Sequence, residues 1–143
     1  MTIARILSSK SRDIITTQPH RTMGEAAKLL ADKGIGAIII TGASGELLGI
    51  LSERDIVRAL ARQGAEAMDE ALSRYMTAKV QTTTPEASVM AVMELMTAGR
   101  FRHVPVMHAG KLEGLISIGD VVKYRLAEME GEHEALKQYI ATA

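Results

Sequence analysis

The chain contains an internal sequence repeat of two copies. The stretch GILSERDIV at 49–57 returns as GLISIGDVV at 114–122, and in both copies Ser and Asp stand three residues apart behind a glycine and two apolar residues. A shift of 65 residues aligns 14–58 with 79–123 without a gap. Such a repeat indicates two copies of one structural unit, each too small to bury a full core alone.

Each unit predicts the same order of elements, β-α-β-β-α. IITT and VQTT begin the two copies as short strands, and Met23, Ala26 and Leu30 place one apolar stripe along the helix that follows. Gly34 and Gly99 stand where that helix needs a left-handed residue to end. Two strands around a glycine-containing turn come next (GAIII with LLGIL, HVPVM with LEGLI), and the second helix starts at Ser-x-x-Asp. The predicted fold class is α+β, with two repeats packed sheet to sheet around a pseudo-twofold axis.

These patterns divide the chain into four segments. We predict a first repeat over 8–65, a linker with a short amphipathic helix over 66–78, a second repeat over 79–126 and a helical tail over 127–143. The tail is rich in charged residues, and it is longer than the second repeat requires. We therefore expect it to make contacts with a partner or with a second copy of the chain.

The composition excludes several classes of function. Lysine plus arginine equals aspartate plus glutamate at 17 each, so no net positive charge attracts nucleic acid or an anionic membrane. Without cysteine there is no disulfide scaffold, thiolate nucleophile or cysteine-based zinc site. Apolar runs such as AIII at 37–40 are far shorter than the roughly 20 residues of a membrane helix. With no signal-like start either, we expect a cytoplasmic protein with neither nucleic acid nor membrane as a partner.

The paired Ser-x-x-Asp motifs, Ser52 with Asp55 and Ser117 with Asp120, allow two interpretations. In the first, serine caps the helix and the acid favours its positive end, and no ligand is involved. In the second, a carboxylate fixed at the helix N-terminus accepts hydrogen bonds from both ribose hydroxyls of a nucleotide. Both roles can coexist, because capping fixes the geometry that a ligand would use.

The repeat, its paired motifs and the stretch RFRHVPV at 100–106 resemble tandem cystathionine-β-synthase (CBS) domains, the Bateman module, over about 14–125. SERD and SIGDVVK are similar to CBS pairs of the stand-alone type. The resemblance implies a regulatory module that dimerises into a flat disc. It also implies binding of adenosine-containing ligands such as AMP, ATP, NAD or S-adenosylmethionine in the cleft between the repeats.

The resemblance implies two unequal ligand sites, because the aspartate of one repeat holds the ribose while a strand of the other faces the phosphates. Opposite Asp55 lies RFRHVPV, so we expect Arg102 and His103 to meet phosphate beside Ser52, with Arg54 assisting. Alternatively, these basic residues form a solvated strand end that blocks edge pairing.

The second expected site lacks the basic pair. Opposite Asp120 and Ser117 lies IGAIII, which carries no charge, and Gly119 replaces Arg54. We expect this site to hold an adenosine moiety or to be empty. Its expected walls come from the first repeat: Thr16, Thr17, Ala37 and Ile38.

The sequence offers little for catalysis. No nucleophile motif is present, and the four histidines, at 20, 103, 108 and 133, lack metal-ligand spacing. We therefore predict a non-enzymatic sensor of adenine nucleotides with no catalytic residue, metal or required cofactor, its bound effector being AMP, ATP or NADH. Two alternatives stay open: an adaptor with vestigial clefts that acts by dimerisation, and, less favoured, a nucleotide hydrolase.

Two partners are expected besides the nucleotide. No effector domain is attached, so regulation would act in trans on an unknown protein. A homodimer is expected because the second helices of the two repeats present apolar faces that a lone pair leaves uncovered. The residues of these faces are Ile56, Val57, Leu60, Val121 and Val122.

Overall fold

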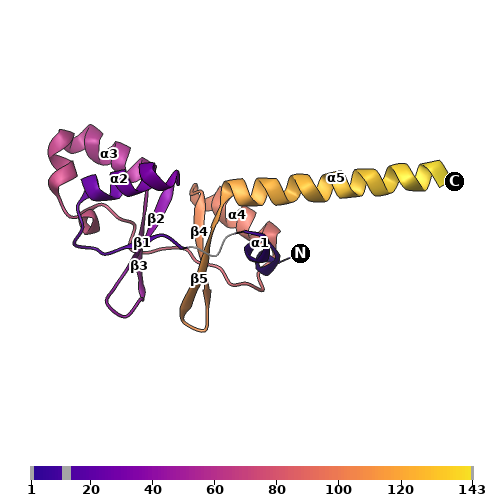
Figure 1. The fold of residues 1–143 in the computed structure, drawn as a ribbon, viewed down its shortest axis with the longest axis horizontal. Coiled ribbons are helices and arrows are strands. Elements are labelled where there is room, and N and C mark those ends of the chain that lie inside the picture. The colour runs from indigo at the N-terminus through magenta and orange to yellow at the C-terminus, as the bar shows by residue number, and fades with distance from the viewer. Residues whose placement is uncertain (1, 11–13, 143) are drawn as a thin grey trace.

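The computed structural model describes residues 2–10 and 14–142 and contains two similar halves (Figure 1). The first half contains β1 (Thr16–Thr17), α2 (Met23–Lys33), β2 (Ala37–Thr41), β3 (Leu47–Ser52) and α3 (Glu53–Gln63). The second half contains α4 (Val89–Gly99), β4 (His103–His108), β5 (Lys111–Ser117) and α5 (Ile118–Thr142). A helix precedes the first half and two short 3₁₀ helices connect the halves: α1 (Ile3–Ser9), η1 (Gly64–Asp69) and η2 (Leu72–Arg74).

The strands form two small sheets, which confirms the α+β class. In the first sheet β1 lies parallel to β2, and β2 pairs antiparallel with β3. In the second sheet β4 pairs antiparallel with β5. The first strand predicted for the second repeat is reduced to a single parallel bridge between Thr83 and Val106. This bridge occupies the place that β1 has beside β2.

The structure corrects the ungapped alignment of the two repeats. The helix caps Thr22 and Ser88 are 66 residues apart, whereas the second strands of the two hairpins keep the predicted spacing of 65. The difference arises in the hairpin turn, which is one residue shorter in the second repeat. The whole of α4 is therefore offset from α2 by 66 residues and not by the predicted 65. Buried Ala26 corresponds to buried Val92 and not to exposed Ala91.

This shift also changes the role of Gly99. Gly34 ends α2 in the left-handed conformation, as predicted, but in the second repeat that conformation belongs to Arg100, with φ of 55°. Gly99 is still helical, and the ring of Phe101 lies where its side chain would be. The prediction for Gly99 was therefore wrong: this glycine is needed for close packing, and Arg100 adopts a backbone conformation that most residues avoid.

Each half is completed by the segment that precedes the other half. Helix α1 packs on the second core through Ile3 and Ile6, and the Ile3 amide donates to the Ala87 carbonyl at 2.9 Å. The η1–η2 segment packs on the first core through Ala67 and Leu72. The predicted linker helix is thus two 3₁₀ helices, and the chain crosses between the halves before each repeat begins.

We call α1 and the connection that contains η1 and η2 the exchanged segments. The first glycine of each Gly-x-x-Ser motif lies beneath one of them. A β-carbon on Gly49 would lie 2.7 Å from the Met76 sulfur and 2.8 Å from the Thr77 backbone oxygen. One on Gly114 would lie 2.6 Å from a methyl group of Leu7. Both glycines therefore permit a close approach that seats the neighbouring segment over the sheet.

Helix α5 continues without a break beyond 126, where the sequence analysis separates repeat from tail. It has 25 residues, and its C-terminal half extends away from the body of the molecule (Figure 1). Over residues 2–10 and 14–142, no helix is both long enough and apolar enough to cross a bilayer.

Candidate functional site

Two cavities lie between the halves, and we call them cleft one and cleft two. Cleft one has a volume of about 560 Å³ and is lined by residues of both repeats. It contains all five residues that were predicted for the first site: Ser52, Arg54, Asp55, Arg102 and His103. The structure therefore brings these residues together around one cavity.

At the floor of cleft one, Ser52 and Asp55 hold each other at the start of α3. The Ser52 amide donates to Asp55 Oδ2 at 2.8 Å, and the Ser52 hydroxyl donates to the same oxygen at 3.2 Å. Both bonds use Oδ2, and within the described residues Asp55 forms no ion pair. The carboxylate is fixed at a helix N-terminus and retains acceptor capacity.

Basic side chains surround this carboxylate. Arg102 and Arg54 line cleft one, as do three further basic residues that were not predicted for the site: Arg58, Lys79 and Arg100. The acidic residues of the lining are Asp55 and Glu53. Five permanent cations against two carboxylates make cleft one a positively charged surface that suits an anion.

His103 lies between the two cavities and lines both. Burial lowers the pKa of the His103 imidazole below its ordinary value, and Lys10 and Arg102 act in the same direction, while Glu53 and Asp120 oppose the shift. The ring is therefore neutral at pH 7 and gains a proton only at more acidic pH.

Cleft two is smaller, at about 310 Å³, and occupies the equivalent place beside the second motif. Of the residues predicted for the second site, Ser117 and Ala37 line this cavity, together with Ile14, Ile15 and Ile35, whereas Asp120 is not among its lining residues. Where cleft one has Arg100 and Arg102, the equivalent positions here are Gly34 and Gly36.

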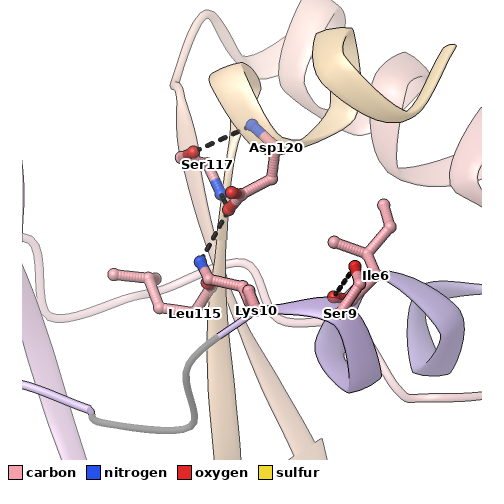
Figure 2. A network of polar contacts seen from close by, with 6 residues as sticks. All are labelled: Ile6, Ser9, Lys10, Leu115, Ser117 and Asp120. Atoms are coloured by element: carbon pink, nitrogen blue, oxygen red, sulfur yellow. Dashed lines mark hydrogen bonds and ion pairs between the residues drawn. The ribbon is translucent and has the colours of Figure 1, made fainter. Parts of the chain in front are cut away.

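The carboxylate of the second motif already has a cationic partner. Lys10 Nζ lies 2.7 Å from Asp120 Oδ2 and donates to the Leu115 carbonyl at 2.8 Å (Figure 2). The Ser117 amide donates to the same Asp120 oxygen at 2.9 Å, and the Asp120 amide donates to Ser117 Oγ at 3.1 Å. Burial raises the pKa of Asp120, but the hydrogen bonds from Lys10 and Ser117 outweigh it, so this pKa lies below its ordinary value.

Cleft two differs from its prediction in two respects. The expectation of an uncharged wall is wrong, because Lys10 lines the cavity from the end of α1, ahead of the stretch 14–58 that aligns with the second repeat. Ile38 is fully buried in the first core, and Thr16 and Thr17 form β1 and are not among the lining residues. Successive side chains of a strand point to opposite faces, so Ile38, which follows the lining residue Ala37 in β2, points away from the cleft.

Part of cleft one could have been found from the sequence. Arg100 belongs to the RFRHVPV stretch, and Lys79 stands just before the first strand of the second repeat. Once Arg102 is assigned to the ligand site, the basic residues near it in the second repeat become candidates for the same site. Arg58 follows Arg54 by one helical turn on α3, so it lies on the same face. Among the described residues, no group of three His, Cys, Asp or Glu is placed to hold a metal ion.

Comparison with known proteins gives a consistent result over most of the chain. The family model for the CBS domain matches twice, at residues 5–62 and 72–127. A curated relative, the mitochondrial CBS domain-containing protein CBSX3 of Arabidopsis thaliana, is 33% identical, covering 97% of this chain and 71% of its own. The crystal structure of the CBS-domain containing protein ATU1752 from Agrobacterium tumefaciens is 46% identical with a TM-score of 0.86, covering 87% of this chain and 99% of its own.

Two further solved structures contain ligands. The CBS domain pair of protein MJ0100, in complex with 5-methylthioadenosine and S-adenosyl-L-methionine, is 26% identical with a TM-score of 0.80, covering 90% of this chain and 98% of its own. The CBS domain protein PAE2072 from Pyrobaculum aerophilum, complexed with AMP, is 25% identical with a TM-score of 0.75, covering 84% of this chain and 89% of its own. All of these ligands contain adenosine, and AMP adds a phosphate.

Proposed function

This chain belongs to the CBS domain family, and on that premise we propose that it is a regulatory module whose cleft one binds an adenosine nucleotide through ribose and phosphate. The complexes of similar proteins with AMP and with S-adenosylmethionine support a ligand of this class. The observation that carries the proposal is the meeting of a fixed carboxylate, Asp55, with five basic side chains in one cavity.

We assign the parts of the nucleotide by their chemistry. The Asp55 carboxylate accepts from the two ribose hydroxyls, while Arg102 and Lys79 hold the phosphate, for which a guanidinium is well shaped. Ile50 and Val80 line the same cavity and offer an apolar surface for the adenine ring. A volume of about 560 Å³ lies within the usual range of small-molecule sites.

Cleft two has a different role in this proposal. Its carboxylate is held by Lys10, and its equivalents of the cleft-one arginines are the glycines Gly34 and Gly36. A ribose could reach Asp120 only by displacing the ammonium group of Lys10. We therefore propose that cleft two takes an adenosine group without phosphate at most.

Thermal unfolding of the purified protein with AMP, ATP, NADH and S-adenosylmethionine tests the nucleotide assignment. Saturation at 100 times the dissociation constant adds about 2.7 kcal/mol of stability, which moves the melting temperature by several degrees. We expect the phosphate-bearing nucleotides to give the largest shifts. No shift with any of the four would favour the adaptor with vestigial clefts.

The proposal describes a regulator and not an enzyme. In the structure, Asp55 Oδ2 accepts from both the amide and the hydroxyl of Ser52, so the two side chains hold each other at the start of α3. We expect ATP and NADH to be recovered unchanged after prolonged incubation with the protein. A rate of product formation that is proportional to the protein concentration would support the hydrolase alternative.

The proposal also includes a cytoplasmic location, a homodimer and a regulated protein encoded elsewhere. Val57 and Leu60 on α3 and Val122 on α5 are exposed, as the dimer prediction requires. Of the other residues predicted for this face, Val121 is a core residue of the second half and is removed from the face, and Ile56 is partly buried against the first core.

A further inference from the structure

Helix α5 has an apolar stripe that its own chain does not cover. Val122, Leu126, Met129, Leu136 and Ile140 are each between 51% and 65% exposed. Together with His133 they are spaced alternately by four and three residues, which is the heptad spacing of a coiled coil. We call these six residues the α5 seam.

The α5 seam is a different face of the helix from the one that packs on the second core. Val121 is buried in the second core, and Tyr124 packs against it. At about 100° per residue, every seam residue lies within about 40° of Val122, and Val121 and Tyr124 lie on other faces of the helix. Helix α5 is thus attached by one face and presents the seam on another, along a segment that extends beyond the body (Figure 1).

The charges beside the seam select a parallel partner. In a parallel, in-register pair, the residue that precedes an a-position of the heptad (here Leu126, His133 and Ile140) meets the partner residue five positions further on. This rule brings Arg125 to Glu130 and Glu132 to Lys137 of the second helix. Both contacts join opposite charges, and each occurs twice in a symmetric pair.

An antiparallel pair of the same helices is disfavoured. If Leu126 packed on the second copy's Leu136, Lys123 would oppose Lys137, and Glu132 would oppose its own copy. All of these contacts join like charges, which destabilise a pair. The sequence of α5 therefore matches a second copy of itself in one orientation.

We propose that two copies of this chain associate through the α5 seam as a parallel two-stranded coiled coil. This inference specifies the homodimer included in the proposed function and does not depend on nucleotide binding. His133 is the polar residue at a central core position, where a polar side chain fixes register at a cost in stability. Arg125, which already pairs with Glu128 at 2.9 Å, then shares its guanidinium with Glu130 of the second copy.

Sedimentation equilibrium of the full chain tests this contact. Leu136→Glu places a charge in the core of the seam and should raise the dimer dissociation constant at least a hundredfold. Gln138→Glu adds the same charge on the outer face of α5 and should leave the dimer unchanged. A monomeric wild type at 100 μM, or a dimer that survives Leu136→Glu in a folded protein, would overturn the proposal and leave the nucleotide assignment intact.

Charge exchange and cysteine cross-linking test the orientation. Glu132→Lys should weaken the dimer by roughly threefold to tenfold, and the added change Lys137→Glu should restore it. The chain has no cysteine, so Leu136→Cys introduces a single thiol. In the parallel pair it should form a disulfide with its own copy. Cross-linking of Leu126→Cys to Leu136→Cys, with neither reacting with itself, would show an antiparallel pair.

Discussion

The two clefts have the same backbone and opposite chemistry. Each is built on a helix that starts at Ser-x-x-Asp, and in each the aspartate accepts from the serine amide at 2.8–2.9 Å. In cleft one the carboxylate faces a cavity lined by five basic residues, whereas in cleft two it is bound to Lys10. The capping role of the motif is thus shared by both repeats, and what distinguishes them is the set of charges around it.

This difference shows where ligand selectivity resides. The motif alone fixes a helix start and a carboxylate in both repeats, so it cannot explain a preference for phosphate. The preference depends on residues at the edge of the opposite repeat, where Arg100 and Arg102 in one half correspond to Gly34 and Gly36 in the other. Changing those residues should alter ligand choice without disturbing the fold.

The largest expected effect is the loss of the cleft-one carboxylate. Asp55→Ala removes two charge-assisted hydrogen bonds to the ribose, each worth about 1.5–3 kcal/mol before water compensates, so affinity for AMP should fall tenfold or more. The matched variant Asp120→Ala should change that affinity by less than about twofold. Calorimetry on both proteins measures the contrast. Unchanged AMP binding in folded Asp55→Ala would reduce the motif to a helix cap.

The packing of the exchanged segments should differ between the repeats. Gly49→Ala forces a β-carbon against the Thr77 backbone oxygen, which cannot move without the chain, so we expect a loss of about 1–3 kcal/mol. Gly114→Ala meets only the end of the partly buried Leu7 side chain, and the reduced entropy of the unfolded chain offsets part of the strain. Urea unfolding compares the two. Equal losses would contradict the assigned contacts.

The ion pair of cleft two should contribute to stability in a pH-dependent way. Lys10→Met leaves the half-buried Asp120 carboxylate without its cation and should destabilise the protein by about 1 kcal/mol at pH 7. The folded-state pKa of Asp120 is lowered, so its contribution is present above the ordinary pKa of aspartate and is lost as the pH falls through the folded value. Unfolding of wild type and variant between pH 7 and pH 3 should converge at the acid end. A constant difference would mean that the lysine acts by packing.

The smallest expected effect concerns His103. Its pKa is lowered by burial, so protonation, and with it a further positive charge beside cleft one, comes only below the ordinary histidine range. AMP binding to wild type should therefore gain roughly threefold over His103→Gln as the pH falls through that lowered range. The ratio of the two proteins cancels the titration of the phosphate itself. A ratio that is flat with pH would remove His103 from the phosphate site.

The sequence predicted the elements well because local patterns determine them. The apolar stripe of α2, the left-handed Gly34 and both helix starts at Ser-x-x-Asp are short-range features, and the structure shows all of them. The one-residue offset of α4 was hidden by chance identities, since alanine and leucine recur often in helices. The correct register is revealed by the helix caps and by burial, with Val92 in the core and Ala91 exposed.

The charge of cleft two could not be predicted in the same way. Lys10 and Asp120 are 110 residues apart, and Lys10 directly follows α1, which precedes the aligned stretch 14–58 and packs on the opposite half. No local pattern reports such a contact, because it depends on how the chain crosses between the halves. Cleft one was more accessible to prediction because both of its sides lie within the repeated unit.

The central claim is that cleft one recognises the phosphate group of the ligand through residues that cleft two lacks. Titration of AMP and adenosine against wild type and Arg102→Ala tests it most directly, with Arg102→Lys as a variant that keeps the charge. We predict that Arg102→Ala weakens AMP about tenfold and adenosine hardly at all, since adenosine offers nothing for a guanidinium to hold. Equal losses of AMP and adenosine would show that Arg102 shapes the cavity without reading the phosphate, and would contradict the account.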